Sequence, residues 1–257
     1  MIPKVIHYVW LGKKEKPEKI KNAMATWQKV LGQDGYKIIE WNEKNWDISQ
    51  SRFASENYKA GKYAYVSDVI RLDVLYKYGG IYLDTDMLVK KSLDPFLNKK
   101  AFWGMMYDDA VSTNIIGTEE KNNFIKYILD KYQNYTREMI VKGELSNNNN
   151  MIISKDFIDY YPEFKLKNIT QKLHDGTYVF PKEYFSFPTY NLKIDYAEHL
   201  FTKTWSNEKY SRIHYLTRDF VECFFGKIAL GKVQSYRGAK RYVELKKYEN
   251  EARKNGH

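Results

Sequence analysis

Cysteine is almost absent from the sequence: Cys223 is the single one among 257 residues. An intramolecular disulfide is therefore excluded, and one thiol fits a chain that works in a reducing compartment. Cys223 stands beside Phe224 and Phe225, so we expect a small buried hydrophobic residue there. Runs of eighteen or more apolar residues are also absent, and the chain opens with a strand pattern instead of a signal peptide. These absences predict a cytoplasmic protein without a transmembrane helix.

Internal repeats and nucleic-acid-binding signatures are absent as well. The sequence contains no helix-turn-helix, zinc-finger or RNP pattern, and its one low-complexity stretch is the asparagine run at 147–150. The net charge of +10, the pI near 9.2 and 23 tyrosines would nevertheless suit a protein that binds nucleic acid by charge and stacking. The aromatic residues are spread over the whole chain, which argues against that class, but it stays the alternative hypothesis.

Strand and helix patterns alternate along a chain of the length expected for one large domain. An amphipathic helix after Pro17 separates two strand patterns, which end near Trp10 and at Trp41. Such an order predicts an α/β fold with a mostly parallel central sheet flanked by helices, and ligands beyond the carboxyl ends of its strands. Further along come two strand patterns, a helix, and an aromatic segment expected to be irregular or an edge strand, at 101–106, 111–117, 124–132 and 178–187.

A helix pattern, two glycines and a strand pattern follow one another in the first third of the chain. Apolar residues recur at helical spacing up to Tyr78, and Asp68 and Arg71 lie on one face of that predicted helix. Gly79 and Gly80 are typical of a helix end, and a short buried strand is expected to start directly after them. The pattern therefore places an acid and a base on a helix that leads straight into a strand.

Two acidic residues end that strand. Asp84 and Asp86 are two positions apart, so their side chains are expected on the same side of the chain. Paired carboxylates suit a hard divalent cation such as Mn²⁺ or Mg²⁺, which in turn suits a diphosphate. A structural alternative stays open at this point: Asp68 and Arg71 as an ordinary helix ion pair, and the two aspartates as a solvated turn.

The segment resembles the central motif of glycosyltransferases with a DXD sugar-binding signature (family 32), which include bacterial capsule and lipooligosaccharide transferases and yeast mannosyltransferases. It is also similar to the glucosyltransferase domain of large clostridial toxins. The shared pattern is Ser-Asp, an Arg three residues after that Asp, and then Gly-Gly-x-Tyr-x-Asp-x-Asp. The positions that match it are Ser67, Asp68, Arg71, Gly79, Gly80, Tyr82, Asp84 and Asp86.

Segments near both ends of the chain resemble the same family. Residues 2–12 are similar to its opening strand, Ile-Pro-Lys-x-Ile-His-x-x-Trp, which implies that Trp10 stacks on the uracil base; a buried core tryptophan is the alternative. Residues 197–205 resemble its His-His-x-x-x-Ser-Trp segment. His199, Thr204 and Trp205 match there, but Leu200 and Lys203 depart from the pattern at a second His and a Gly.

The resemblance implies a GT-A type nucleotide-sugar-binding fold and a role for each matched side chain. Asp86 and His199 would bind the metal directly, and Asp84 would bind it through water or contact the ribose. Asp68 and Arg71 would grip sugar hydroxyls. Nucleotide-sugar binding would further involve the matched aromatic residues and the hydroxyl that closes over the diphosphate, namely Trp10, Tyr82, Thr204 and Trp205.

The activity implied by the resemblance is that of a retaining, metal-dependent glycosyltransferase using Mn²⁺ or Mg²⁺. A hexose would move from a nucleotide sugar, expected to be UDP-linked glucose, galactose or an N-acetylated form, to a glycan hydroxyl. The acceptor would be a glycan, a lipid-linked sugar or a glycoprotein in bacterial surface polysaccharide or glycoconjugate synthesis. A GDP-mannose-dependent mannosyltransferase is the alternative.

Positive charge is concentrated at the C-terminus. Residues 227–257 contain nine Lys or Arg against three Glu. We therefore divide the chain into a catalytic domain, 1–225, and a basic helical tail, 226–257. A weak apolar stripe on that tail would let it lie on an anionic membrane surface, at the inner face of the membrane. A solvated helix is the competing interpretation of the stripe Tyr242, Leu245, Tyr248 and Ala252.

Overall fold

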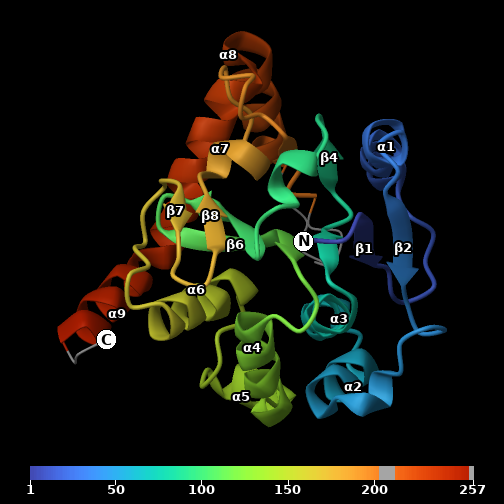
Figure 1. The fold of residues 1–257 in the computed structure, drawn as a ribbon. Coiled ribbons are helices and arrows are strands. Elements are labelled where there is room, and N and C mark those ends of the chain that lie inside the picture. The colour runs from blue at the N-terminus through green and yellow to red at the C-terminus, as the bar shows by residue number, and fades with distance from the viewer. Residues whose placement is uncertain (203–211, 255–257) are drawn as a thin grey trace.

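The structure is a computed structural model that describes residues 1–202 and 212–254, and only the backbone of 212–225. Its centre is a seven-stranded sheet (Figure 1). From one edge to the other, the strands are β2 (Lys37–Trp41), β1 (Val5–Val9), β3 (Gly80–Leu83), β6 (Ala110–Thr118), β5 (Ala101–Tyr107), β8 (Thr177–Phe180) and β7 (Gln171–Lys172). A separate two-stranded sheet pairs β4 (Met87–Val89) with β9 (Ala197–His199).

Five of the seven central strands run in one direction. The pairs β2/β1, β1/β3 and β5/β8 are parallel, whereas β3/β6, β5/β6 and β7/β8 are antiparallel. Only β6 and β7 therefore run against the others. Because β1 and β3 are parallel neighbours, Trp10 and Asp84, which directly follow them, lie at the same edge of the sheet.

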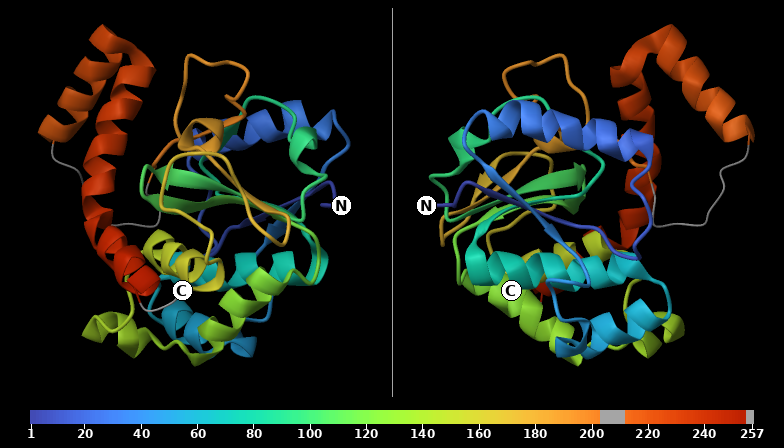
Figure 2. Two further views of the ribbon diagram at one scale, coloured as in Figure 1. Left: turned by 60° about the vertical axis from the view of Figure 1, so that its left-hand side comes forward. Right: turned by 90° about the vertical axis from the view of Figure 1, so that its right-hand side faces the viewer.

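Helices cover both faces of the sheet (Figure 2). They are α1 (Glu18–Trp27), α2 (Arg52–Lys59), α3 (Tyr63–Tyr78), α4 (Asn123–Asn134), α5 (Arg137–Lys142), α6 (Asn149–Tyr160), α7 (Lys182–Phe185), α8 (Arg212–Ala239) and α9 (Val243–Lys254). Shorter turns lie at Ile48–Gln50, Asp94–Phe96 and Lys240–Tyr242 (3-10) and at Gln28–Gly32 (π).

Buried side chains form one apolar cluster on each face of the sheet. On one face Leu72 of α3 and Phe157 of α6 belong to the same cluster as Trp103 of β5. On the other face α1 and α7 contribute Trp27 and Phe185. The predicted fold class is confirmed: the chain forms an α/β domain with a mostly parallel central sheet flanked by helices.

Segment 178–187 differs from the expectation. It was predicted to be irregular or an edge strand, but β8 pairs with β5 on one side and β7 on the other. Pro181 does not interrupt this pairing, because it comes directly after the strand and precedes α7. The true edge strand is β7, whose two residues show no strand pattern of their own.

The two glycines between α3 and β3 are required by space and by backbone conformation. Gly79 has φ 60° and Gly80 has φ 100°, values that side chains other than glycine rarely adopt. A Cβ atom on Gly79 would lie 2.7 Å from the amide nitrogen of Glu120, and one on Gly80 would lie 2.7 Å from the carbonyl oxygen of Val5. The turn is therefore tight enough to join α3 to the centre of the sheet without a loop.

His7 of β1 packs against this turn and is neutral. Its Nε2 lies 2.9 Å from the carbonyl oxygen of Gly79, and Nε1 of Trp41 donates to its Nδ1 at 3.0 Å. The Trp41 bond needs an unprotonated Nδ1, so Nε2 carries the hydrogen and donates to Gly79. Burial lowers the pKa of His7 to about 4, against the opposing effect of the Gly79 hydrogen bond.

We expect the folded state to lose stability between pH 6.5 and 4 because of His7. An unfolded chain binds the proton below about pH 6.5, whereas the folded chain binds it only near pH 4. No stability is lost above pH 6.5, and the loss amounts to about 3 kcal/mol by the time the pH reaches 4. Urea denaturation of the wild type and His7→Gln at pH 7.5, 5.5 and 4.5 measures it. Parallel pH profiles for the two proteins would contradict this assignment.

The C-terminal helices pack on the domain. α8 bends at Gly226, and α9 lies against α6. Tyr242 and Leu245 are buried in the same cluster as α6, and Tyr248 and Ala252 pack on it. The prediction that the apolar stripe of the tail faces lipid is therefore wrong, because the stripe faces the protein. The boundary between residues 225 and 226 stays a prediction, and the side chain of Cys223 lies outside the described part.

Candidate active site

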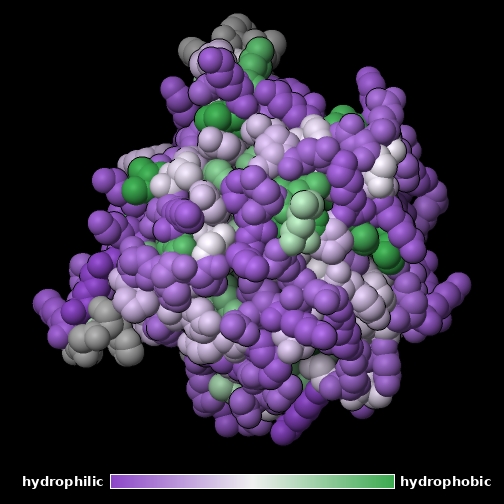
Figure 3. All heavy atoms as spheres, viewed as in Figure 1, coloured by the Kyte–Doolittle hydropathy of each residue, from purple (hydrophilic) through white to green (hydrophobic). Residues whose placement is uncertain are grey.

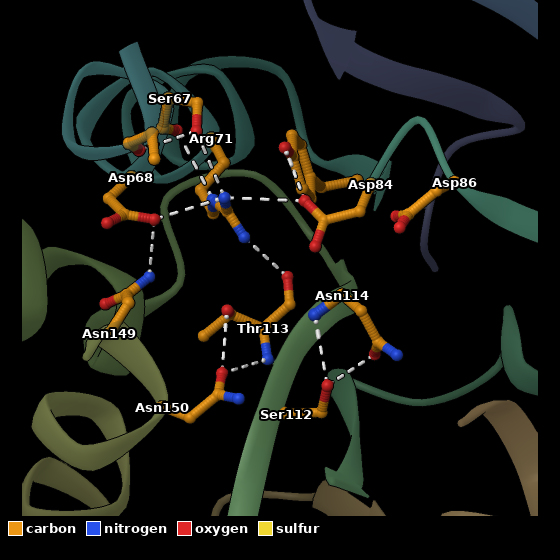
Figure 4. A network of polar contacts seen from close by, with 12 residues as sticks. Ser67, Asp68, Arg71, Asp84, Asp86, Ser112, Thr113, Asn114, Asn149 and Asn150 are labelled. Carbon is orange, nitrogen blue, oxygen red and sulfur yellow. Dashed lines mark hydrogen bonds and ion pairs between the residues drawn. The ribbon is translucent and has the colours of Figure 1, made fainter. Parts of the chain in front are cut away.

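Arg71 is the centre of a buried polar network at the carboxyl end of β3 (Figure 4). Its Nη2 lies 3.1 Å from Asp68 Oδ1 and 3.4 Å from Asp84 Oδ1, so one cation bridges the helix α3 and the residue that follows β3. Its Nη1 donates to the carbonyl oxygen of Thr113 in β6 at 2.7 Å, and its guanidinium lies over the ring of Tyr82 at 4.4 Å. Arg71 is 5% exposed, so these contacts are shielded from water.

Asp68 has one oxygen occupied by protein and one available. Its Oδ1 forms the ion pair with Arg71 and accepts a hydrogen bond, at 2.7 Å, from Nδ2 of Asn149 at the start of α6. Among the described residues no hydrogen bond uses its Oδ2. Burial raises the pKa of Asp68 to about 6, although Arg71 and Asn149 oppose the shift. A carboxylate with one fixed and one free oxygen is suited to accept a hydrogen bond from a ligand hydroxyl.

Asp86 is bound by the segment around β9. Its Oδ1 lies 3.1 Å from Nε2 of His199, and its Oδ2 accepts from the backbone nitrogen and the hydroxyl of Thr202, each at 2.9 Å. Burial favours the neutral acid, but His199 and the Thr202 donors outweigh it and leave the pKa of Asp86 well below its ordinary value. Burial likewise disfavours a charged His199, yet the Asp86 carboxylate raises the pKa of that ring.

The three side chains Asp84, Asp86 and His199 fit a shared metal ion. One ligand atom of each lies within 4.8 Å of the others, and they are the one such group that the described residues bring together. Nδ1 of His199 is buried without a hydrogen-bond partner in the described part of the chain. Two carboxylates and one imidazole suit a divalent ion that accepts oxygen and nitrogen ligands. The predicted pairing of the two aspartates with a distant histidine is therefore geometrically possible.

Sequence reasoning missed several polar residues of this site. Asn150 accepts from the backbone nitrogen and the hydroxyl of Thr113, at 3.1 and 2.9 Å. Ser112 donates to Asn114, whose carbonyl oxygen accepts from the backbone nitrogen of Asp84 at 2.9 Å. β6 thus supports Arg71 and Asp84 through its backbone. The only signal was the asparagine run at 147–150, which composition alone could not connect to Asp68 or Arg71.

Trp10 directly follows the carboxyl end of β1 and packs, only partly buried, against one of the two apolar clusters. It is half-buried at the end of β1, its Nε1 donates to the carbonyl oxygen of Lys14 at 2.7 Å, and the ammonium of Lys16 lies 5.3 Å from the ring centre. A partly exposed ring beside the acidic pair is compatible with a shelf for a base. Thr204 and Trp205, the other predicted nucleotide-sugar residues, lie outside the described residues.

We expect Trp10→Ala to weaken UDP binding by about 1–3 kcal/mol, as other base stacks do, with little change in melting temperature. The reason is that Trp10 is only partly buried against the apolar cluster, so its truncation costs less stability than that of a fully buried ring, whereas a bound base would cover its exposed part. Trp27→Ala is the matched comparison, because Trp27 is fully buried and its loss costs about 3–5 kcal/mol of stability. Isothermal titration with UDP and Mn²⁺, together with thermal melting, measures both. A melting temperature lowered as much as in Trp27→Ala would reject the stacking role.

The fold and the site together define an α/β domain with a candidate cation site and a buried Asp–Arg pair at the carboxyl end of one strand. Comparison with known proteins shows what this part of the chain is similar to. Residues 17–103 match the family described as a glycosyltransferase sugar-binding region containing a DXD motif. That region includes Asp68, Arg71, Asp84 and Asp86. This part of the chain therefore matches a glycosyltransferase family, which favours an enzyme of that class over a nucleic-acid-binding protein.

Individual relatives cover different shares of the chain. Inositol phosphoceramide mannosyltransferase 3 of Schizosaccharomyces pombe is 31% identical over 136 residues, which are 50% of this chain and 36% of that protein. An uncharacterized glycosyltransferase of Acanthamoeba polyphaga mimivirus, L373, is 28% identical over 195 residues, 70% of this chain and 74% of the viral protein. The chain spans about a third of the length of two S. pombe mannosyltransferases that it matches.

Among solved structures, the PaToxG glycosyltransferase is similar to 63% of this chain over 70% of its own length. The sequence identity is 20% and the TM-score 0.48.

Proposed function

We propose that the protein is a metal-dependent, retaining glycosyltransferase that moves a hexose from a nucleotide sugar to a hydroxyl of a glycan. The observation that carries the proposal is the position of the Asp84, Asp86 and His199 group beside the buried Asp68 and Arg71. The first group suits a cation with a diphosphate, and the second suits sugar hydroxyls. Retention of the anomeric configuration rests on the family resemblance.

Each side chain has a defined task in this proposal. Asp84, Asp86 and His199 would bind Mn²⁺ or Mg²⁺, which supplies positive charge beside the leaving diphosphate. The free Oδ2 of Asp68 would accept a hydrogen bond from a sugar hydroxyl. Arg71 would keep Asp68 in place and supply charge close to the sugar. Because both side chains are buried, their contacts with the donor would act in a medium of low dielectric constant.

The donor is proposed from two different observations. Resemblance to capsule transferases and clostridial toxins supports a UDP-linked glucose, galactose or N-acetylated sugar. The yeast relatives are named for mannosyl transfer, which supports mannose as the sugar and GDP-mannose as the second candidate donor. Either donor would place its diphosphate at the metal ion held by Asp84, Asp86 and His199. Its sugar would then point toward Asp68. The acceptor is proposed to be a glycan, a lipid-linked sugar or a glycoprotein.

Slow transfer of the sugar to water tests the proposal without an acceptor. The protein is incubated with UDP-glucose, UDP-galactose, UDP-N-acetylglucosamine or GDP-mannose, with Mn²⁺ or with a chelator. We expect release of UDP or GDP from one donor, dependent on the metal. Thermal stabilisation by the same donor and Mn²⁺ is the second readout. Absence of both effects across the panel would reject the proposal.

A peripheral membrane contact is proposed for the outer face of α8 and α9. Figure 3 shows hydrophilic side chains over α9 and only small separated apolar spots. Four cations of α8 and the turn after it are exposed and form no ion pair with the described residues: Lys227, Lys232, Arg237 and Arg241. Their positive charge is complementary to an anionic lipid surface. No helix in the described part of the chain has the length and apolarity needed to cross a bilayer.

We expect neutralisation of these four cations to remove binding to vesicles that contain phosphatidylserine. Each cation contributes about 1 kcal/mol near such a surface. Replacement by Gln is preferable to truncation, because removal of residues 238–257 would also remove buried Tyr242 and Leu245. The matched control replaces four exposed lysines elsewhere by Gln, namely Lys44, Lys59, Lys62 and Lys121. Equal loss of co-sedimentation in both variants would indicate unspecific charge attraction and contradict the proposal.

A further inference from the structure

Tyr242 links the C-terminal segment to the polar network around Asp68 and Arg71. This residue ends the 3-10 turn between α8 and α9 and is 3% exposed. Its hydroxyl accepts a hydrogen bond from Nδ2 of Asn148 at 2.8 Å, and its ring packs beside Tyr107 of β5 with 5.4 Å between ring centres. A tyrosine hydroxyl buried this deeply adds one polar contact at the N-terminal end of α6.

Asn148 is the N-cap of α6, so its side chain is already in use by the helix. Its Oδ1 accepts from the backbone nitrogen of Asn150 at 3.0 Å, while its Nδ2 donates to Tyr242. A side-chain amide whose oxygen and NH₂ group are both hydrogen-bonded is held in one orientation. Tyr242 therefore supports the capping amide of α6, because without its hydroxyl the NH₂ group of Asn148 loses its partner.

The first turn of α6 carries the contacts to the acid and the base of the site. Asn149 donates to Asp68 at 2.7 Å, and its Oδ1 accepts from Tyr132 at 2.9 Å. Asn150 accepts from Thr113, whose carbonyl oxygen accepts from Arg71. Figure 4 shows both asparagines directed from α6 toward these partners. Two chains of hydrogen bonds thus run from the same capped turn to Asp68 and to Arg71.

We propose that Tyr242 is a positioning residue for donor-sugar binding, acting through the Asn148 cap on Asn149 and Asn150. The proposal rests on the proposed function, because it assigns Asp68 and Arg71 to the sugar. It gives the C-terminal segment a role in the reaction that is separate from its charge. Tyr242 would affect binding of the hexose part of the donor, and not of the nucleotide or the metal.

The structure supplies a matched control in the same segment. Tyr248 of α9 donates to Oδ1 of Asp159 at 2.7 Å, near the C-terminal end of α6 and thus away from the capped turn. Tyr242→Phe and Tyr248→Phe each delete one hydroxyl and one hydrogen bond to the same helix. Their comparison separates an effect on the site from a general effect on the packing of α9.

The test compares sugar nucleotides with free nucleotides by titration calorimetry in the presence of Mn²⁺. We expect Tyr242→Phe to weaken binding of UDP-glucose or GDP-mannose, whichever the wild type binds, roughly tenfold, the range of mutations within a coupled network. Binding of UDP or GDP and of Mn²⁺ alone should stay unchanged, and Tyr248→Phe should leave all of them unchanged. Equal sugar-nucleotide affinity in the wild type and Tyr242→Phe would overturn the inference.

Hydrogen exchange tests the same link without any donor. The amides of Asn150 and Thr113 are bonded to the Asn148 and Asn150 side chains, so they report directly on the capped turn. We expect faster exchange at both amides in Tyr242→Phe and not in Tyr248→Phe. Unchanged exchange would overturn the inference even if the wild type bound no sugar nucleotide. Failure of the wild type to bind any sugar nucleotide would by itself count against the proposed function only.

Discussion

Replacement of Asp86 by Asn is expected to reduce metal-dependent donor hydrolysis by about a thousandfold at any Mn²⁺ concentration. The charge that the ion supplies to the leaving diphosphate is worth several kcal/mol, and each 1.4 kcal/mol corresponds to a factor of ten in rate. Asn keeps the shape of Asp86 and its acceptor for Thr202, but it removes the negative charge next to His199. Initial rates of UDP or GDP release over a series of Mn²⁺ concentrations measure the effect.

Asp130→Asn is the control for this change. Asp130 lies on α4, half-exposed and paired with Lys126, outside the group of possible metal ligands. It should keep the wild-type rate. Circular dichroism and calorimetric titration with Mn²⁺ complete the comparison, because Asp86→Asn should remain folded but bind the ion weakly. A folded Asp86→Asn protein with near-normal turnover would show that the metal assignment is wrong.

Replacement of Arg71 by Met is expected to lower the free energy of unfolding by about 3–5 kcal/mol, the usual effect of removing one partner of a buried ion pair. Asp68 would stay buried without its cation, and the carbonyl oxygen of Thr113 would lose its donor. Met has a similar length, so the change leaves little empty space. Urea denaturation at pH 7.5 measures the loss.

The double variant Arg71→Met with Asp68→Asn distinguishes charge from packing. If the unpaired carboxylate causes the instability, the neutral amide should recover most of it. Neither variant should hydrolyse donor, because both lack the Asp–Arg pair that we assign to the sugar. A double variant as unstable as Arg71→Met alone would mean that Arg71 stabilises the domain through packing or through Thr113, and not by compensating Asp68.

Patterns within one element were predicted correctly from the sequence. The helix before the glycines, the short strand after them and the pair of strands at 101–106 and 111–117 all occur, with ends shifted by a few residues. The alternation of these elements also predicted the α/β class. Such features depend on the spacing of neighbouring residues, which fixes the side of a helix or strand on which each side chain lies.

Partners far apart in the chain were identified only in part. The resemblance pointed to His199 as a ligand next to Asp86, but Thr202, Asn149 and Thr113 had no assigned role. Their contacts depend on strand register and on how α6 packs against β6. The asparagine run looked like a polar loop, although two of its members bond to Asp68 and Thr113. Composition does not contain that information.

The environment of the C-terminal tail also could not be predicted from local spacing. Its stripe of Tyr242, Leu245, Tyr248 and Ala252 has the spacing of any amphipathic helix, and that spacing is equally compatible with lipid, solvent or protein on the apolar side. Packing on α6 decides among them, because only the tertiary structure brings a second apolar surface to the stripe. The sequence by itself determined the chemistry that the chain can offer: paired carboxylates, an acid and a base on one helix face, and a basic C-terminus. The tertiary structure alone decided which of these groups meet, since contacts over more than a hundred residues, such as Asp86 with His199 and Thr202, depend on sheet order and helix packing and not on local spacing.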